Sequence, residues 1–337
     1  MTDAPAEFIS LLSNAGLLED NETPTFEPLA GGVSSDIWRA DLARGPVCVK
    51  KALSKLKVAQ DWRAPVERNV YEAQWLETAG NIIPGATPRI LARDTARGMF
   101  AMEYLDPVRF PCWKDQLLKG HAEPAFAAAV GEHLARIHSA TGQDKDIAAS
   151  FPTDEIFHTI RLAPYLETTA VAHPELSDAI FALVRVTAET HTALVHGDVS
   201  PKNILAGPDG PVFLDAECSW YGDPAFDLAF CLNHLLLKCL AVPAKTDVFL
   251  LSFDALAQSY LETVTAEPPD TIEARTARLL PGLFLARVDG KSPVEYITNE
   301  ADKNRVRRSA SAWLLKPADR LADIGRLWGE DLNGDTK

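Results

Sequence analysis

Four residues in the middle of the chain have the types and the spacing that phosphoryl transfer needs. His196 and Asp198 stand two residues apart, Asn203 follows after four further residues, and Asp215 closes the β-prone run Val212-Phe213-Leu214. In phosphoryl transfer from a nucleotide, a carboxylate orients the attacking hydroxyl and accepts its proton, while oxygen ligands hold Mg²⁺ over the phosphates. Mg²⁺ favours carboxylate and amide oxygens, which fits Asn203 and Asp215. These residues therefore point to a metal-dependent phosphoryl-transfer site.

A polar surface turn is the alternative, because Gly197, Pro201 and Asn203 are all turn-forming residue types. The context favours chemistry instead. The segment follows the apolar pair Leu194-Val195, continues into Ile204-Leu205, and leads to an aspartate beside an apolar residue.

A second set of candidate residues lies upstream, where phosphates would be held. Gly31 and Gly32, followed by Ser34 and Ser35, form a turn between two β-prone runs, and its main-chain N–H groups could cover phosphates. Further on, Val47-Cys48-Val49-Lys50 resembles the third-strand pattern in which a lysine binds nucleotide phosphates. Side chains alternate along a strand, so Lys50 shares a face with Cys48 and Lys51 points away. A solvated lysine pair is the alternative reading.

The phosphate lysine needs a carboxylate partner on the following helix, predicted over residues 66–79 with Gly80 as its end. Glu67 and Glu72 are five residues apart and cannot share one helical face well. The spacing from Arg68 to Glu72-Ala73 resembles that of the methylthioribose kinase group, and this resemblance favours Glu72, with Glu67 as a surface charge.

Three stretches of sequence, HGDVSPKN, LDAE and GDPAFDLA, resemble the aminoglycoside phosphotransferase and choline kinase superfamily. The stretch DAECSWYGDPAFDLAFCLNHLLL is especially similar to the methylthioribose kinase group, although the Pro-Lys-Asn of the catalytic loop departs from that group. The resemblance implies ATP and Mg²⁺ as cofactors. Matched residue by residue, it implies Asp198 as the catalytic base, Asn203 and Asp215 as metal ligands, and His196 and Asp227 as structural supports.

The same resemblance implies where adenine and the acceptor bind. The segment Met102-Glu103-Tyr104-Leu105 resembles the family hinge, where the main chain of Glu103 and Leu105 would bind adenine and Met102 would line the pocket. Acceptor contacts are expected from Arg287, Lys291 and Trp220. Two roles stay open: Lys202 reaches either a phosphate or solvent, and Glu217 binds either a second metal or a structural hydrogen-bond partner.

The predicted secondary structure that positions these residues changes along the chain from strands to helices. Short β-prone runs and one helix occupy the first hundred residues, whereas helical patterns dominate from Pro107 onward, at about 124–141, 174–190, 224–240, 246–264, 272–288 and 300–315. A β-rich part followed by a helical part indicates an α+β fold with a cleft between two lobes. We expect a protein-kinase-like fold, with a nucleotide-binding lobe at 1–103 and a helical lobe at 104–337 that carries the catalytic loop and the acceptor site.

Composition limits the function classes. A net charge of −14 disfavours nucleic acid as a partner. The five cysteines form no C-x-x-C pair, the N-terminus has no signal-peptide pattern, and the richest apolar run, 225–242, is interrupted by polar residues. We therefore expect a cytoplasmic protein without a membrane span; the oligomeric state is left open.

The function expected from all this is an ATP-dependent small-molecule kinase. It would transfer the γ-phosphate to a hydroxyl of a sugar, an amino alcohol or an aminoglycoside-like acceptor. A catalytically silent nucleotide-binding regulator is the alternative. A protein kinase is disfavoured because no Ala-Pro-Glu signature follows Asp215.

Overall fold

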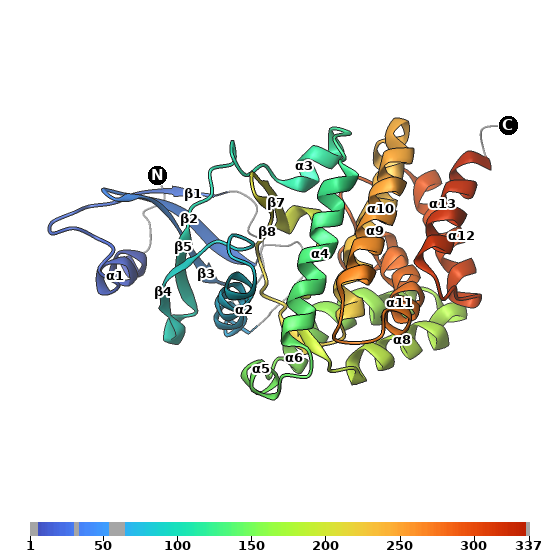
Figure 1. Ribbon diagram of the computed structural model, residues 1–337, viewed down its shortest axis with the longest axis horizontal. Coiled ribbons are helices and arrows are strands. Elements are labelled where there is room, and N and C mark those ends of the chain that lie inside the picture. The colour runs from blue at the N-terminus through green and yellow to red at the C-terminus, as the bar shows by residue number, and fades with distance from the viewer. Residues whose placement is uncertain (1–5, 30–33, 54–64, 335–337) are drawn as a thin grey trace.

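The computed structural model describes residues 6–29, 34–53 and 65–334 and divides into a small β-rich part and a large helical part (Figure 1). The small part is built on one antiparallel sheet with the strand order β1-β2-β3-β5-β4. Its strands are β1 (Thr25–Pro28), β2 (Ser35–Leu42), β3 (Gly45–Ala52), β4 (Ile90–Asp94) and β5 (Met99–Glu103). The predicted glycine turn at Gly31 and Gly32 lies outside the described residues.

The two faces of this sheet pack against different helices. Helix α1 (Ala6–Asn14) buries Phe8, Leu11 and Leu12 against one face, together with Val49 and Ala101. Helix α2 (Arg68–Ile82) lies toward the other face, where its Trp75 and Leu76 join Phe100 in the main core. Because neighbouring side chains on a strand point to opposite faces, β3 presents Lys50 and Lys51 to different surroundings.

The prediction that Gly80 ends this helix was wrong, since α2 continues to Ile82. A Cβ atom at Gly80 would lie 2.7 Å from the Thr87 side-chain oxygen. The glycine therefore permits a close approach of the following segment rather than a break in the helix.

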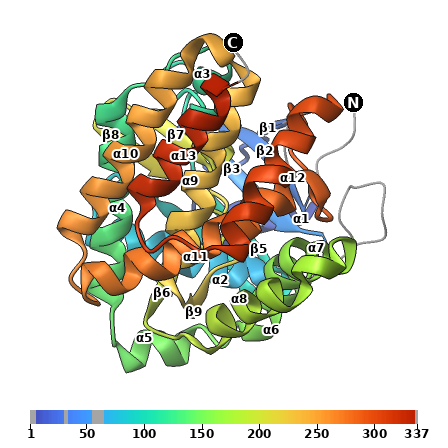
Figure 2. The ribbon, with the colours of Figure 1, turned by 90° about the vertical axis from the view of Figure 1, so that its right-hand side faces the viewer.

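The large part is an assembly of helices around α9 (Pro224–Ala241), in which every residue except the last is buried. By length and composition α9 alone among the described helices could span a membrane, but 94% of that segment is buried inside the protein. Helices α4, α10 and α11 pack around it, and α8, α12 and α13 lie further out (Figure 2). The bounds of the longer helices are α4 (Pro124–Thr141), α8 (Ser177–Glu189), α10 (Thr246–Thr263), α11 (Pro269–Asp289), α12 (Glu300–Leu315) and α13 (Leu321–Gly334).

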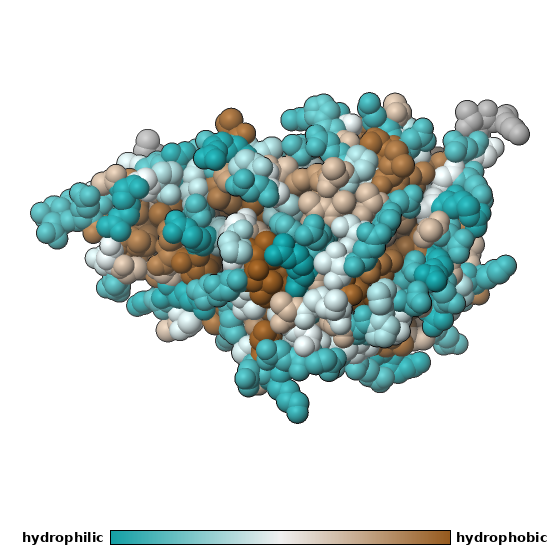
Figure 3. Space-filling view, viewed as in Figure 1, coloured by the Kyte–Doolittle hydropathy of each residue, from teal (hydrophilic) through white to brown (hydrophobic). Residues whose placement is uncertain are grey.

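Shorter elements connect the sheet to these helices and link the helices to one another. They include α3 (Trp113–Leu118), α5 (Lys145–Ser150), α6 (Asp154–Phe157), a π-helical segment (His158–Glu167) and α7 (Thr168–Ala172). Two small antiparallel strand pairs follow. One consists of β6 (Ala193–Val195) and β9 (Trp220–Gly222), and the other of β7 (Ile204–Gly207) and β8 (Gly210–Phe213), which lies within the stretch that separates β6 from β9. On the face of the molecule shown in Figure 3, hydrophobic side chains form several patches among hydrophilic ones.

Candidate active site

The loop after β6 carries His196, Gly197 and Asp198, and α9 fixes its backbone. The Asp227 carboxylate in the first turns of α9 accepts hydrogen bonds from the main-chain N–H of His196 at 2.7 Å and of Gly197 at 2.8 Å. Gly197 has a left-handed backbone with φ of 77°, and a Cβ atom there would lie 2.3 Å from the Cys218 carbonyl oxygen. Only glycine fits this position. Asp227 thus sits where the predicted structural support was expected.

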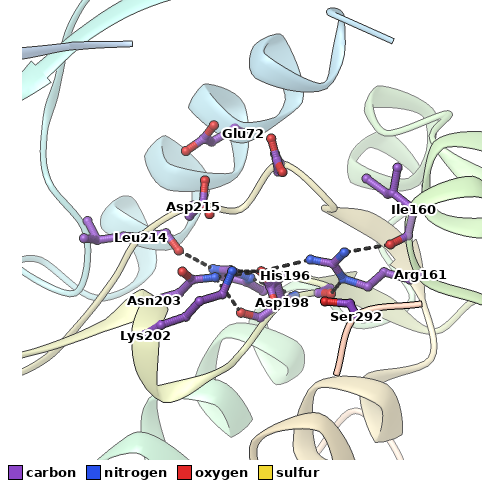
Figure 4. A network of polar contacts seen from close by, with 12 residues as sticks. Glu72, Ile160, Arg161, His196, Asp198, Lys202, Asn203, Leu214, Asp215 and Ser292 are labelled. Atoms are coloured by element: carbon purple, nitrogen blue, oxygen red, sulfur yellow. Dashed lines mark hydrogen bonds and ion pairs between the residues drawn. The ribbon is translucent and has the colours of Figure 1, made fainter. Parts of the chain in front are cut away.

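His196 joins this loop to the one that carries Asp215. Its Nδ1 accepts from the main-chain N–H of Asp198 at 3.2 Å, and its Nε2 lies 3.0 Å from the Leu214 carbonyl oxygen (Figure 4). These partners require the proton on Nε2. Burial lowers the pKa of His196, which keeps the ring neutral at physiological pH. The imidazole therefore acts as a fixed bridge between two loops.

Asp198 is 4% exposed, and three side chains of the described residues contact the same oxygen of its carboxylate. Its Oδ2 accepts from Asn203 Nδ2 at 2.9 Å and lies 2.9 Å from Arg161 Nη2 and 3.2 Å from Lys202 Nζ. Burial opposes the charge, but the two cations outweigh it and lower the pKa of Asp198. An ionised carboxylate is thus held in place through one of its two oxygens.

Arg161 is the site residue that the sequence analysis missed. It lies in the π-helical segment, a form of helix that is often found at functional sites. Pro164 has no N–H to bond the Ile160 carbonyl in α-helical fashion, and that carbonyl accepts from Arg161 Nη1 at 2.7 Å. Arg161 Nε donates to the Gly197 carbonyl at 2.6 Å. The only sequence signal was an arginine, followed by a proline, in an otherwise apolar run.

The predicted phosphate lysine lies among carboxylates in the cleft. Lys50 is 2% exposed, its Nζ lies 2.8 Å from Glu72 Oε1, and it also contacts Asp215 Oδ1. Burial disfavours the ammonium, but Asp215 and Glu72 outweigh it and raise the pKa of Lys50. For Glu72 the effects have the opposite sign: burial raises the pKa of this carboxyl group, and Lys50 limits that rise.

The neighbouring residues that the sequence analysis set aside lie elsewhere. Lys51 contacts Glu7 of α1 on the opposite face of the sheet. Glu67 is exposed and precedes the first residue of α2. The alternation of β3 and the choice of Glu72 over Glu67 therefore correspond to the observed contacts, whereas the role of Lys50 toward a phosphate stays a prediction.

Asn203 and Asp215 present oxygen donors of the kind that Mg²⁺ prefers. Asp215 has φ of 63°, a backbone conformation that few non-glycine residues adopt, and Lys50 and Lys202 lower its pKa against the effect of burial. Such strain is concentrated at functional sites. Over the described ranges no cluster of three or more His, Cys, Asp or Glu side chains could hold a metal. A magnesium ion with phosphate oxygens needs only one or two carboxylates from the protein, so this donor set fits it.

Two cavities adjoin at the loop that carries Asp198. The larger one, of about 780 Å³, is lined by Lys50, Glu72, Asn203 and Asp215, and also by the predicted hinge residues Met102, Glu103 and Leu105. The smaller one, of about 160 Å³, is lined by Asp198, and Lys114 and Lys202 line both. Ser34 and Ser35 are buried at the start of β2 and line neither cavity.

The three expected acceptor residues are not brought together. Arg287 lines the small cavity, whereas Lys291 does not, although its neighbour Ser292 does. The expectation for Trp220 was wrong. Its ring stacks on Phe157 with a centroid distance of 4.2 Å, and its Nε1 donates to Asp154 at 2.8 Å, so it belongs to the core beneath the loop.

The two residues whose roles were open are also placed. Glu217 Oε2 lies 2.9 Å from Arg68 Nε, so this carboxylate has a structural partner in the structure. Lys202 is half exposed and stands between Asp198 and the large cavity.

The architecture is that of known small-molecule kinases. The chain superposes on "Amicoumacin kinase hAmiN in complex with AMP-PNP, Ca2+ and Ami" with a TM-score of 0.55 and 14% identity, covering 96% of this chain and 97% of that one. It superposes on an ethanolamine kinase of Plasmodium vivax with a TM-score of 0.53 and 12% identity, covering 97% and 87%. The predicted protein-kinase-like α+β fold is therefore confirmed.

Residues 25–238 match the model of the phosphotransferase enzyme family (APH), and the chain belongs to that family. It is 25% identical over 231 residues to methylthioribose kinase 1 of Oryza sativa subsp. japonica, covering 60% of this chain and 54% of the relative. It is 27% identical over 226 residues to methylthioribose kinase of Pectobacterium carotovorum subsp. carotovorum, covering 58% and 55%. The predicted resemblance is confirmed, and the chain spans about half the length of these curated relatives.

Proposed function

We propose that the protein transfers the γ-phosphate of ATP, bound with Mg²⁺, to a hydroxyl of a small-molecule acceptor. The observation that carries this proposal is the position of Asp198. Its ionised carboxylate is held through Oδ2 by three donors and lines a small cavity that adjoins the large, lysine-containing one.

The large cavity suits a nucleotide. Asn203 and Asp215 would hold Mg²⁺, which neutralises charge on the phosphates when bound. Lys50 would bind a phosphate and is kept in place by Glu72. The Glu103 N–H already donates to the Arg89 carbonyl at 2.9 Å, so this residue would contact adenine through its own carbonyl, and Leu105 through its N–H.

The chain's own groups then organise the acceptor. A hydroxyl that donates to Asp198 Oδ1 would be oriented toward the large cavity and would lose its proton to that carboxylate as its oxygen bonds to the γ-phosphorus. The bond between that phosphorus and the oxygen that bridges it to the β-phosphate breaks in the same step, and ADP leaves. Arg161 and Lys202 hold the carboxylate in place. Lys202 also lines the large cavity, so its ammonium would contact the phosphoryl group in transit.

The alternatives fit less well. A silent regulator would have no need for Lys50, Asp198, Asn203 and Asp215 to be assembled around adjoining cavities. A protein substrate requires a docking segment after Asp215, but α9 begins soon afterwards, at Pro224. The five cysteines are all unpaired, which supports a reducing compartment such as the cytoplasm.

Calorimetry of ATP binding with and without Mg²⁺ tests the nucleotide site. We expect Mg²⁺ to tighten ATP binding to the parent protein and to have no such effect on Asp215→Ala, because the carboxylate that holds the ion is gone. Asp209→Ala, an exposed aspartate in the β7–β8 turn, is the matched control and should behave like the parent. Equal metal enhancement in Asp215→Ala and parent would refute the assignment.

A further inference from the structure

We propose that the acceptor is a small anionic hydroxy compound, either a hydroxy acid or a sugar phosphate, whose negatively charged group binds Lys238 and Arg287 in the small cavity. This inference deepens the proposed function and rests on it for the identity of the cavity as the acceptor site. It narrows the acceptor classes expected from the sequence, because amino alcohols and aminoglycosides are cations.

Lys238 is the central observation. It projects from α9, lines the small cavity and is 0% exposed. Its Nζ has no hydrogen-bond partner among the described residues and lies 3.6 Å from the centroid of the Tyr296 ring. The carboxylate that acts on it most strongly, Glu295, is paired with Lys114 instead. Burying an ammonium without a direct ion-pair partner is costly.

Arg287 stands in the same cavity with neutral partners. Its Nη1 donates to the Tyr165 hydroxyl at 3.1 Å and to the main-chain carbonyl of Ser292, and its Nε has no partner in the described part of the chain. The guanidinium is thus held in position by neutral oxygens while its charge is uncompensated. An arginine fork of this kind matches the geometry of a carboxylate or a phosphate.

The small cavity also gathers several buried hydrogen-bond donors that lack a partner among the residues described. Thirteen buried side-chain polar atoms lack a partner across the described ranges, and four of them belong to residues that line this one cavity: Ser200 Oγ, His234 Nε2, Lys238 Nζ and Arg287 Nε. All four can donate hydrogen bonds. Buried polar groups are normally satisfied, so a cluster of unused donors indicates a ligand rich in acceptor oxygens.

The carboxylates of the cavity are already neutralised. Asp198 is held by Arg161 and Lys202, and Glu295 Oε1 lies 2.6 Å from Lys114 Nζ. Four cations but only two carboxylates line the cavity, in a chain whose net charge is −14. This local excess of positive charge attracts an anion and repels a cationic acceptor.

The size of the cavity points to a small ligand. Its volume of about 160 Å³ is below the roughly 300–1,000 Å³ of pockets that hold drug-sized ligands. Because Asp198 lines the same cavity as Lys238 and Arg287, a short molecule could present its hydroxyl to the first while its anionic group contacts the other two.

A matched series of probes that differ in charge tests this proposal directly. Glycerol, glycerate, glycerol 3-phosphate and 3-amino-1,2-propanediol share a small hydroxylated skeleton. Their binding to the 337-residue chain is measured by ligand-observed NMR titration with a saturating ATP analogue and Mg²⁺, and again without nucleotide. We expect an anionic probe to bind at least about tenfold more tightly than glycerol, and the cationic probe to bind more weakly than glycerol. Tighter binding of glycerate identifies a carboxylate site, and tighter binding of glycerol 3-phosphate a phosphate site.

Variants connect the binding to the named residues. Lys238→Met and Arg287→Gln should each weaken the preferred anion at least about tenfold. Lys245→Met, which removes an exposed lysine just beyond the same helix, should leave it unchanged. Lys238→Met removes an unpaired buried charge, so its melting temperature should equal or exceed that of the parent, which separates loss of binding from loss of fold.

The proposal is overturned if the neutral or cationic probe binds as well as the anionic ones, if neither anionic probe binds, or if Lys238→Met retains anion affinity. Nucleotide binding is scored in the same samples. If anions bind through Lys238 but ATP with Mg²⁺ does not bind, the proposed kinase function fails and the anion site stands.

Discussion

Two buried lysines, one in each cavity, show opposite electrostatic arrangements. Lys50 is surrounded by the carboxylates of Glu72 and Asp215, which raise its pKa although burial acts against the charge. Lys238 forms no ion pair with a carboxylate in the described part of the chain; burial, with the nearby cations Lys114 and Arg287, lowers its pKa to about 7, although Glu295 acts in the opposite direction. The first lysine is fully compensated by the protein, and the second is compensated only when something else supplies a negative charge.

This difference separates two ways of preparing a site. Around Lys50 the protein fixes its own charges in advance, so the large cavity is organised before any ligand arrives. Around Lys238 the hydrogen-bond donors have no partner within the described ranges, which lowers the stability of the folded protein. An anionic ligand would restore that stability by binding these donors. Asp198 lines the small cavity with Lys238, beside the large cavity that holds Lys50. Substitutions at Asp198, Lys50 and Lys238 should therefore have different effects.

The largest effect is expected at Asp198, between the two lysines. Asp198→Asn should lower kcat on the true acceptor by about 10²–10⁴-fold, because the amide cannot accept the proton of the hydroxyl. Nucleotide binding in the large cavity should be unchanged, since Asp198 does not line it. Steady-state kinetics together with calorimetry of ATP binding check both halves. Near-native kcat in this variant would show that the carboxylate is not the base.

The next effect distinguishes the compensated lysine from its neighbour in the sequence. Lys50→Ala should lower kcat by about 10²–10³-fold, since a group that stabilises phosphate charge is lost. Lys51→Ala should be nearly silent, because Lys51 contacts Glu7 on the far face of the sheet. Glu72→Ala should resemble Lys50→Ala, and Glu67→Ala should resemble the parent. Kinetics of the four variants at saturating acceptor measure this, and an inactive Lys51→Ala would contradict the assignment.

The two lysines also show what the sequence could predict. Lys50 was predicted because strand alternation and a local motif determine which way it points. Helical spacing separated Glu72 from Glu67, and the resemblance of the Arg68 to Glu72 spacing to a known family chose between them. The helix predicted at 124–141 likewise came from a local pattern, and its bounds are those of α4. Local periodicity therefore sufficed for the elements and for the residues that short motifs encode.

The other half of the site depends on contacts between distant segments. Arg161 meets Asp198 from a π-helical turn 37 residues earlier in the chain, and no spacing rule connects them. Lys238 was interpreted only as a polar interruption in an apolar run, because a missing partner is visible only in three dimensions. Trp220 was misplaced for the same reason, since its stacking on Phe157 is a tertiary contact.

The smallest effect follows from the titration of Lys238. In the ligand-free protein its pKa is lowered to about 7, so the ammonium is present below pH 7 and is lost as the pH rises above it. An anion binds the ammonium and not the neutral amine, so affinity should be greatest near pH 6 and fall by up to about tenfold per pH unit above 7, until the raised pKa of the complex is reached. The charged and titratable groups that surround Lys238 are His234 on its own helix, Cys112 and Lys114 at the start of α3, Arg287 on α11, and Glu295 and Tyr296 in the loop that follows α11.

Glycerate is the probe for this titration, because its carboxylate stays ionised throughout the range while a phosphate would itself titrate. We expect its dissociation constant to increase from pH 6 to pH 8 in the parent protein and in Arg287→Gln, whose remaining lysine still titrates. In Lys238→Met the affinity should be weak and independent of pH. His234 does not produce the same profile, since burial and the neighbouring cations lower its pKa well below the ordinary value and keep it neutral over the whole range. A pH dependence that survives in Lys238→Met would assign the titration to another group, and the contrast between the two buried lysines would then not explain anion binding.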